Sequence, residues 1–300
     1  MTILITGAWA CAKEYFNRIE ELGYEIFFLQ NEKDPLPCEY DFINVVVCNN
    51  LFAYHDIRKF TSLKCIQLTS AGLDRVPLDY IKEQNIELFN AGGVYSVPMA
   101  EFAVSGILQI YKQTEFFRKN QSQRLWNKSR NLLEICGKTV CILGCGNIGT
   151  ECAKRLKAFG AHIIGVDVFQ KTSEYYEKIY LIDEMKEALK GADIIILTLP
   201  LTNETHHLFN SDTFNFVKSG SLIVNISRGK IVDEKALLEA LDNKLMGAVI
   251  DVFEEEPLSD NNPLWNKENI IITPHNSFVG DGNNKRLSEL VINNLKNLNY

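Results

Sequence analysis

The sequence lacks the features that mark several classes of protein. No stretch approaches the roughly 18 consecutive apolar residues that a transmembrane helix needs, so no membrane span is expected. No basic residue precedes the first apolar run, which starts at Ile3, and the first cation is Lys13, so no secretory signal is expected. With only 18 glycines and 8 prolines in 300 residues, collagen-like and low-complexity classes are excluded.

Clustered positive charge is also missing. The chain has 31 basic and 38 acidic residues, a net charge of −7, and no long basic run. Binding to nucleic acid needs clustered lysine and arginine, so nucleic acid is not expected as the main partner. The acidic balance does not exclude a small anionic ligand, because one or two cations can make a single cleft locally positive.

The eight cysteines form no Cys-x-x-Cys pair. Cys141, Cys145 and Cys152 lie near one another in the sequence, but their spacing matches no common zinc pattern. We therefore expect reduced, buried thiols in a cytoplasmic protein, and no metal site.

What the sequence does contain is an ordinary globular composition, with 46% hydrophobic and 23% charged residues. Short apolar runs alternate with longer amphipathic ones, which predicts an α/β fold built on parallel sheets. The predicted strands are Ile3–Thr6, Ile43–Cys48, Cys65–Leu68, Ile86–Phe89, Thr139–Leu143, His162–Val166, Ile194–Leu199, Leu222–Ile226, Gly247–Ile250 and Ile270–Thr273. The predicted helices are Cys11–Leu22, Leu78–Glu83, Ala100–Lys119, Ile148–Phe159, Leu181–Lys190, Glu234–Leu241 and Gly282–Leu298.

A chain of this length suggests two domains, at about 150 residues each. The long helix Ala100–Lys119 is the natural joint between two series of strands, and only one helix's worth of chain remains after Thr273–Gly280. The pattern therefore predicts two doubly wound parallel-sheet domains in a nested arrangement. Residues 98–278 would be inserted in an outer domain made of residues 1–97 plus 279–300.

A glycine-rich turn is predicted at the start of the inner domain. Gly144, Gly146 and Gly149 fit the pattern Gly-x-Gly-x-x-Gly, between a predicted strand and a predicted helix. This setting is typical of dinucleotide binding, because the glycines permit a tight turn and a close approach of the backbone. A pyrophosphate can then sit at the N-terminus of the helix.

Asp167 ends the next predicted strand, 18 residues after Gly149. An acidic residue at about this distance accepts hydrogen bonds from the ribose hydroxyls of a dinucleotide. It also repels a 2′-phosphate, and no arginine follows it, so NAD is expected as the cofactor in preference to NADP.

Three further signatures follow later predicted strands, where open parallel sheets bind ligands. They are Asn225-Ile226-Ser227-Arg228-Gly229, then Asp251-Val252-Phe253-Glu254-Glu255-Glu256-Pro257, then Thr273-Pro274-His275-Asn276. In this order, after the glycine-rich turn, they resemble the D-isomer-specific 2-hydroxyacid dehydrogenases, a family that includes D-lactate, D-glycerate and 3-phosphoglycerate dehydrogenases. The resemblance implies a Rossmann NAD-binding domain inserted in a flavodoxin-like substrate domain. It also implies a homodimer formed largely by the cofactor domains.

The resemblance assigns catalytic roles to three residues. Arg228 would bind the substrate carboxylate and keto oxygen, since a planar guanidinium forms paired hydrogen bonds. His275 would be the acid–base group, because an imidazole both donates and accepts a proton near neutrality. Glu256, which the Glu-Pro order of the family motif selects from three adjacent glutamates, would bond to His275 and fix its tautomer.

The resemblance also places residues around the cofactor and the substrate. The cofactor contacts would be Gly144, Gly146, Asn147, Ile148, Gly149 and Asp167 at the glycine-rich turn, Leu199, Pro200 and Thr205 in the loop that passes under the cofactor, and Ile226, Ser227 and Asp251 near the nicotinamide. Ser70, Ala71 and Gly72 resemble an outer-domain loop whose backbone amides, together with Arg228, hold the substrate carboxylate.

The expected function is NAD-dependent interconversion of a small 2-keto acid and a D-2-hydroxy acid, with His275 as acid and base. One alternative is an NAD(H)-sensing binding protein, like the corepressors that resemble the same family, and another is a related dehydrogenase with a substrate such as formate. The segment Asn276–Gly280 departs from the family pattern, which commonly has small residues there. Phe278 is therefore expected to alter the pocket, which weakens assignment to lactate, glycerate or phosphoglycerate.

Overall fold

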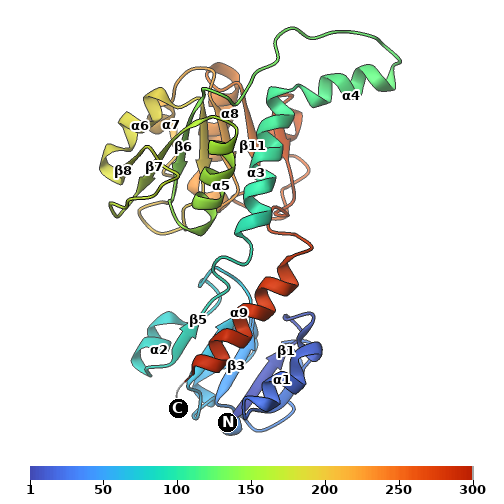
Figure 1. Ribbon diagram of the computed structural model, residues 1–300, viewed down its shortest axis with the longest axis vertical. Coiled ribbons are helices and arrows are strands. Elements are labelled where there is room, and N and C mark those ends of the chain that lie inside the picture. The colour runs from blue at the N-terminus through green and yellow to red at the C-terminus, as the bar shows by residue number, and fades with distance from the viewer. Residues whose placement is uncertain (299–300) are drawn as a thin grey trace. The chain divides into compact units, whose positions relative to one another are not determined.

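The computed structural model describes residues 1–298 and divides the chain into two compact units (Figure 1). Unit 1 comprises Met1–Tyr95 together with the chain from Gly280 onward, and unit 2 comprises Ser96–Val279. The joints predicted from the sequence, after residues 97 and 278, lie two residues and one residue away from these. Within residues 1–298, no helix is both long enough and apolar enough to cross a membrane.

Unit 1 is built on a five-stranded sheet with the order β2-β1-β3-β4-β5, and every pair of neighbours is parallel. The strands are β1 (Thr2–Thr6), β2 (Glu25–Leu29), β3 (Val45–Cys48), β4 (Cys65–Leu68) and β5 (Glu87–Phe89). The helices are α1 (Phe16–Glu21), α2 (Leu78–Glu83) and α9 (Asn283–Asn297). Strands β3 and β4 are buried along their whole length, as expected where both faces of a parallel sheet are covered.

The last helix, α9, packs within unit 1, far along the chain from the strands that it covers (Figure 1). The indole Nε1 of Trp9 donates to Ser288 Oγ at 3.0 Å, and the Tyr24 hydroxyl donates to the Leu295 carbonyl at 2.9 Å. Leu295 belongs to a buried apolar cluster that also holds residues of β1. The final helix therefore completes the core of the first 95 residues.

Unit 2 is built on a seven-stranded parallel sheet with the order β12-β11-β10-β9-β6-β7-β8. The strands are β6 (Thr139–Leu143), β7 (His162–Asp167), β8 (Lys178–Leu181), β9 (Ile194–Leu197), β10 (Leu222–Asn225), β11 (Gly247–Ile250) and β12 (Ile270–Ile272). The strand order reverses between β6 and β9, and a doubly wound sheet binds ligands outside the carboxyl ends of its strands at such a point. The predicted fold class, two doubly wound parallel-sheet domains, is confirmed.

The helices of unit 2 are α3 (Ser96–Tyr111), α4 (Thr114–Ser122), α5 (Asn147–Ala158), α6 (Met185–Gly191), α7 (Ser211–Phe216) and α8 (Glu234–Asn243). Short 3₁₀ turns in the two units span Ala12–Tyr15, Tyr40–Phe42, Leu51–Ala53, Ile57–Lys59, Ile182–Glu184, Gly229–Ile231 and Pro263–Asn266. Helix α3 packs closely on the sheet at Gly106, where a Cβ atom would overlap the side chain of Val249 in β11.

The predicted single helix Ala100–Lys119 is wrong. Helix α3 ends at Tyr111, Gln113 adopts a left-handed conformation with φ of +50°, and α4 begins at Thr114. A left-handed residue cannot continue a right-handed helix, so the chain changes direction there. As a result, α4 and the chain after it extend away from the sheet of unit 2 (Figure 1).

Candidate active site

The glycine-rich turn connects β6 to α5. Gly144 has φ of +94°, which favours glycine, and a Cβ atom on Gly149 would overlap the carbonyl oxygen of Gly144. At Gly146, by contrast, a Cβ atom would meet no atom within 4 Å, so this side of the turn is open. No side chain of the described residues caps the first turn of α5, which begins at Asn147. Its backbone N–H groups are therefore suited to an anion such as a pyrophosphate.

Asp167, at the end of β7, is tied to this turn. Its Oδ2 atom accepts hydrogen bonds from the backbone N–H of Cys145 at 3.0 Å and from Lys171 Nζ at 2.9 Å. Its Oδ1 atom accepts from the N–H groups of Val168 at 2.8 Å and Phe169 at 3.3 Å. The carboxylate is thus fixed beside the glycine-rich turn, where a dinucleotide would place its ribose.

The charge of Asp167 follows from two opposed effects on its pKa. Burial raises the pKa of this carboxyl, but the hydrogen bonds that it accepts from Lys171, Phe169 and Cys145 outweigh burial. The pKa of Asp167 therefore lies below its usual value, and the group is ionised at neutral pH.

The turn after β10 is held by one amide side chain. Asn225 Oδ1 accepts hydrogen bonds from the backbone N–H and the hydroxyl of Ser227, at 3.1 and 2.8 Å, and Asn225 Nδ2 donates to the Arg228 carbonyl at 3.1 Å. At Gly229, a Cβ atom would overlap the backbone of Phe253. The turn that carries Arg228 therefore presses directly against the segment that follows β11.

That segment carries a glutamate paired with a histidine from the next strand. His275 Nδ1 lies 2.8 Å from Glu256 Oε2, and Glu256 Oε1 accepts a hydrogen bond from the N–H of Phe253 at 3.0 Å. A carboxylate only accepts, so Nδ1 carries the proton and Nε2 is left to exchange one. Of the three adjacent glutamates, Glu256 is thus the one that contacts His275, and Phe278 meets the same imidazole edge-on at 6.0 Å.

His275 is held in an unusual backbone conformation. Its φ is +50°, a left-handed value that is uncommon for a residue other than glycine. The N–H of His275 donates to the carbonyl oxygens of Asp251 at 2.8 Å and Thr273 at 3.0 Å. The surrounding chain therefore fixes the direction in which the imidazole leaves the backbone.

Strand register brings these groups to one edge of the sheet. Asn225 of β10 pairs with Ile250 of β11, and Ile250 pairs with Ile272 of β12. Arg228, Asp251 and His275 follow these three strands at their carboxyl ends, where such sheets bind ligands. Glu256 joins them through its bond to His275. The arrangement can bind an anion and exchange a proton on the same edge.

Comparison with known proteins agrees with this geometry. Residues 104–277 match the model of the family described as "D-isomer specific 2-hydroxyacid dehydrogenase, NAD binding domain". The chain belongs to this family. It is 30% identical over 241 residues to a glyoxylate reductase of Korarchaeum cryptofilum, a match that covers 78% of this chain and 72% of that protein.

Two further comparisons extend the match. A D-3-phosphoglycerate dehydrogenase of Methanocaldococcus jannaschii is 35% identical over 243 residues, which cover 80% of this chain but only 46% of the relative. The match with this chain thus spans about half the length of that dehydrogenase. The crystal structure of a D-isomer specific 2-hydroxyacid dehydrogenase family protein from Aeromonas salmonicida is 31% identical, with a TM-score of 0.86 over 98% of this chain and 94% of that one.

NAD is the cofactor of this 2-hydroxyacid dehydrogenase domain, as the sequence predicted. The residues at the glycine-rich turn fit it: the open side of Gly146 leaves room for the pyrophosphate, and Asp167 lies where the ribose hydroxyls are expected. Asn147 and Ile148 form the start of α5. In the loop after β9, Thr205 Oγ1 donates to the Pro200 carbonyl at 2.7 Å, which gives that loop a defined shape.

The side chain of Asp251, which the resemblance places near the nicotinamide, is surrounded by hydrogen-bond donors of the protein itself. Its side chain is fully buried, and its oxygens accept hydrogen bonds from Thr273 Oγ1 at 2.6 Å and from the N–H groups of Asn276 and Ser277 at 2.8 and 2.9 Å. The carboxylate therefore organises the segment that carries His275. Its nearness to the nicotinamide stays a prediction.

The other residues that the sequence predicts for the cofactor and substrate sites lie in buried or hydrogen-bonded loops after the strands. Ile226 and Ser227, which precede Arg228, are buried, and Leu199 is buried in the loop just after β9. Ser70, Ala71 and Gly72 follow β4 in unit 1, where Ser70 Oγ donates to the Gly72 carbonyl at 3.1 Å and Asn90 Nδ2 donates to the Ala71 carbonyl at 2.7 Å. Their contacts with the cofactor or the substrate stay predictions.

The cysteines are free thiols and belong to no metal-binding cluster of residues 1–298. All eight cysteines, which lie within the described residues, are free thiols. Burial raises the pKa of Cys145 to about 11 and that of Cys152 to about 12, so both thiols are protonated and unreactive at neutral pH. Among residues 1–298, no group of three or more histidine, cysteine, aspartate or glutamate side chains could hold a metal ion.

Lys171 is the site residue that sequence reasoning missed. It follows Asp167 by four residues in a loop, and a lone lysine in a polar loop is most often a solvated surface charge. Only the fold shows that its ammonium group pairs with the carboxylate at 2.9 Å.

Proposed function

We propose that this chain is an NAD-dependent oxidoreductase that interconverts a small 2-keto acid and a D-2-hydroxy acid. The observation that carries the proposal is the 2.8 Å bond between His275 and Glu256 at the same sheet edge as Arg228. When bound, the reduced cofactor supplies the hydride to the keto carbon. The protein must then supply a proton for the keto oxygen and a cation for the carboxylate.

His275 and Arg228 can meet these two needs. With Nδ1 held by Glu256, the Nε2 atom of His275 is the one that gives a proton to the keto oxygen or takes it from the hydroxyl. Glu256, which accepts from Nδ1, holds the imidazole in the orientation and tautomer that this exchange needs. The guanidinium of Arg228 would bind the substrate carboxylate through paired hydrogen bonds.

A panel of 2-keto acids tests this proposal. NADH absorbance is followed with glyoxylate, pyruvate, hydroxypyruvate and longer 2-keto acids, after NADH binding has been measured separately. We expect NADH oxidation with at least one member, and a D-configured product wherever the product is chiral. Bound NADH with no turnover of any member would contradict the proposal and favour the NAD(H)-sensing alternative.

A cytoplasmic location also stays a prediction.

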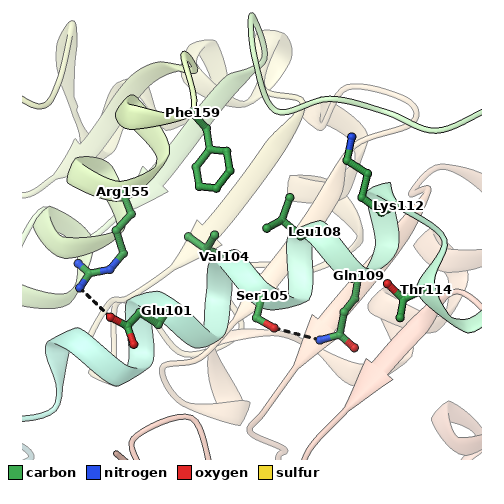
Figure 2. Close-up of a pocket in the computed structure, with 9 residues that line it drawn as sticks. All are labelled: Glu101, Val104, Ser105, Leu108, Gln109, Lys112, Thr114, Arg155 and Phe159. Atoms are coloured by element: carbon green, nitrogen blue, oxygen red, sulfur yellow. Dashed lines mark hydrogen bonds and ion pairs between the residues drawn. The ribbon is translucent and has the colours of Figure 1, made fainter. Parts of the chain in front are cut away.

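We also propose that the chain forms a homodimer through the segment from α4 to Arg130, here called the arm. Large apolar side chains are exposed on the arm, and Trp126 is 94% exposed. A groove of about 490 Å³ lies between α3 and α5, with Val104, Leu108 and Phe159 along it (Figure 2). Burying the arm of one copy in the groove of another would remove apolar surface of both from water.

The dimer prediction is tested by the mass of the protein in solution. Sedimentation equilibrium should give twice the chain mass of 34.1 kDa. Changing Trp126 to serine on the arm, or Leu108 to glutamate in the groove, should each shift the protein towards monomer, because each removes apolar contact at one side of the interface. Leu78→Glu, an exposed leucine in unit 1, is the control and should remain dimeric. A wild-type mass of 34.1 kDa would refute the dimer.

A further inference from the structure

The ion pair between Asp167 and Lys171 bears on the choice of cofactor. Asp167 is the carboxylate expected to meet the ribose hydroxyls at the adenosine end of NAD. Lys171 Nζ lies 2.9 Å from Asp167 Oδ2, and the side chains are 43% and 10% exposed respectively. The positive member of the pair therefore faces solvent, while the negative member lies beneath it.

The usual argument against NADP assumes that the carboxylate is unpaired. A 2′-phosphate carries a charge of about −1.5 to −2 at pH 7 and is repelled by a bare carboxylate. Here an ammonium group bonds to that carboxylate, so the repulsion is largely offset. Lysine also has a flexible four-carbon stem, so the ammonium can reach a phosphate close to the carboxylate.

Asp167 keeps other hydrogen bonds if Lys171 turns away. The N–H groups of Cys145, Val168 and Phe169 all donate to it, at 3.0, 2.8 and 3.3 Å. Moving the ammonium from the carboxylate to a phosphate would therefore leave no oxygen of Asp167 without a donor. The carboxylate remains fixed and able to accept from the ribose of NAD.

We propose that Lys171 is a specificity-determining residue that lets this site bind NADP(H) as well as NAD(H). The lysine serves as the cation for the 2′-phosphate of NADP(H). With NAD(H), which has no such phosphate, it stays paired with Asp167. The inference goes beyond the proposed reaction, because it concerns cofactor affinity and does not depend on which 2-keto acid is reduced.

The test is equilibrium binding of NADH and NADPH to the full chain, followed by the fluorescence of the reduced nicotinamide. Wild-type dissociation constants for the two cofactors should differ by no more than about tenfold. Lys171→Gln should raise the ratio of the NADPH constant to the NADH constant by about tenfold or more, since a hydrogen bond to a charged group is lost. Lys171→Arg keeps the charge and should keep the ratio near the wild-type value.

The control is Lys190→Gln, which removes the same charge from α6, where Lys190 pairs with Glu187 at 2.5 Å. It should leave the ratio unchanged. Added salt should weaken NADPH binding more than NADH binding in the wild type, and this difference should shrink in Lys171→Gln. An unchanged ratio in Lys171→Gln, or wild-type protein that binds NADH but not NADPH, would overturn the inference. Loss of binding for both cofactors in the wild type would instead count against the proposed function.

Discussion

Replacing His275 by asparagine is expected to lower the turnover number by about 10²- to 10⁴-fold, the range typical of removing a positioned acid–base group. Asparagine can still bond to Glu256, so the segment that carries it should keep its shape. It cannot donate a proton to a developing alkoxide as an imidazolium can. NADH affinity should stay near the wild-type value, because the glycine-rich turn and Asp167 lie on other strands.

His162→Asn is a matched control for this experiment. His162 also places Nδ1 2.8 Å from a glutamate oxygen, that of Glu177. This exposed pair lies where β7 begins and just before β8, away from the carboxyl ends of the strands. The change should leave turnover and NADH affinity unaltered. The acid–base role of His275 is wrong if His275→Asn turns over at the wild-type rate, or if His162→Asn causes the same loss.

In the proposed reaction Glu256 would act through His275, to which it is bonded, and would therefore be a positioning residue. Glu256→Gln keeps an oxygen that can accept from Nδ1, whereas Glu256→Ala leaves both the imidazole and the N–H of Phe253 without this partner. A positioning role therefore predicts a smaller fall in turnover for glutamine than for alanine. It also predicts little change in the dissociation constant of NADH for either variant.

Local motifs were the part of the site that the sequence could predict. The glycine-rich turn depends on neighbours in the chain: the left-handed φ of Gly144 and the tight contact at Gly149 both arise within six residues. The alternation of apolar runs predicted both parallel sheets, because strands covered on two faces are apolar throughout. Strands β2 and β8 were missed, since both are edge strands with charged or half-buried residues among the apolar ones.

Contacts between distant segments could not be predicted. Gly229 is required because Phe253 passes directly beside it, and Lys171 matters because the loop after β7 folds back onto Asp167. The break at Gln113 had no proline or glycine to mark it, so the amphipathic pattern favoured one continuous helix. At Gly229 and Lys171, contacts between distant segments decided the local structure.

Asp251 is a buried carboxylate whose side chain holds the segment that carries His275, the acid–base group of the proposed reaction. It is fully buried and binds three donors of the segment from Thr273 to Ser277, which includes His275. Alanine at this position would leave the Thr273 hydroxyl and the N–H groups of Asn276 and Ser277 without their acceptor. An unsatisfied buried donor costs about 1–3 kcal/mol. The Ser277 N–H is buried and the other two donors are partly buried, so we expect the unfolding free energy to fall by about 3 kcal/mol.

Asp251→Asn separates the hydrogen bonds from the packing, because it keeps the size of the side chain and one acceptor oxygen. Its NH₂ group would face a backbone donor in either orientation, the N–H of Ser277 or that of Asn276, so we expect a smaller loss of about 1–3 kcal/mol. The control is Asp242→Ala, which removes an exposed carboxylate paired with Lys267 and should cost at most about 1 kcal/mol. Urea unfolding measures all three, and NADH oxidation by the still-folded variants measures turnover. If Asp251 positions His275, turnover should fall more in Asp251→Ala than in Asp251→Asn, and the affinity for NADH should stay at the wild-type value in both. Wild-type turnover in Asp251→Ala would show that the segment keeps its shape without the carboxylate.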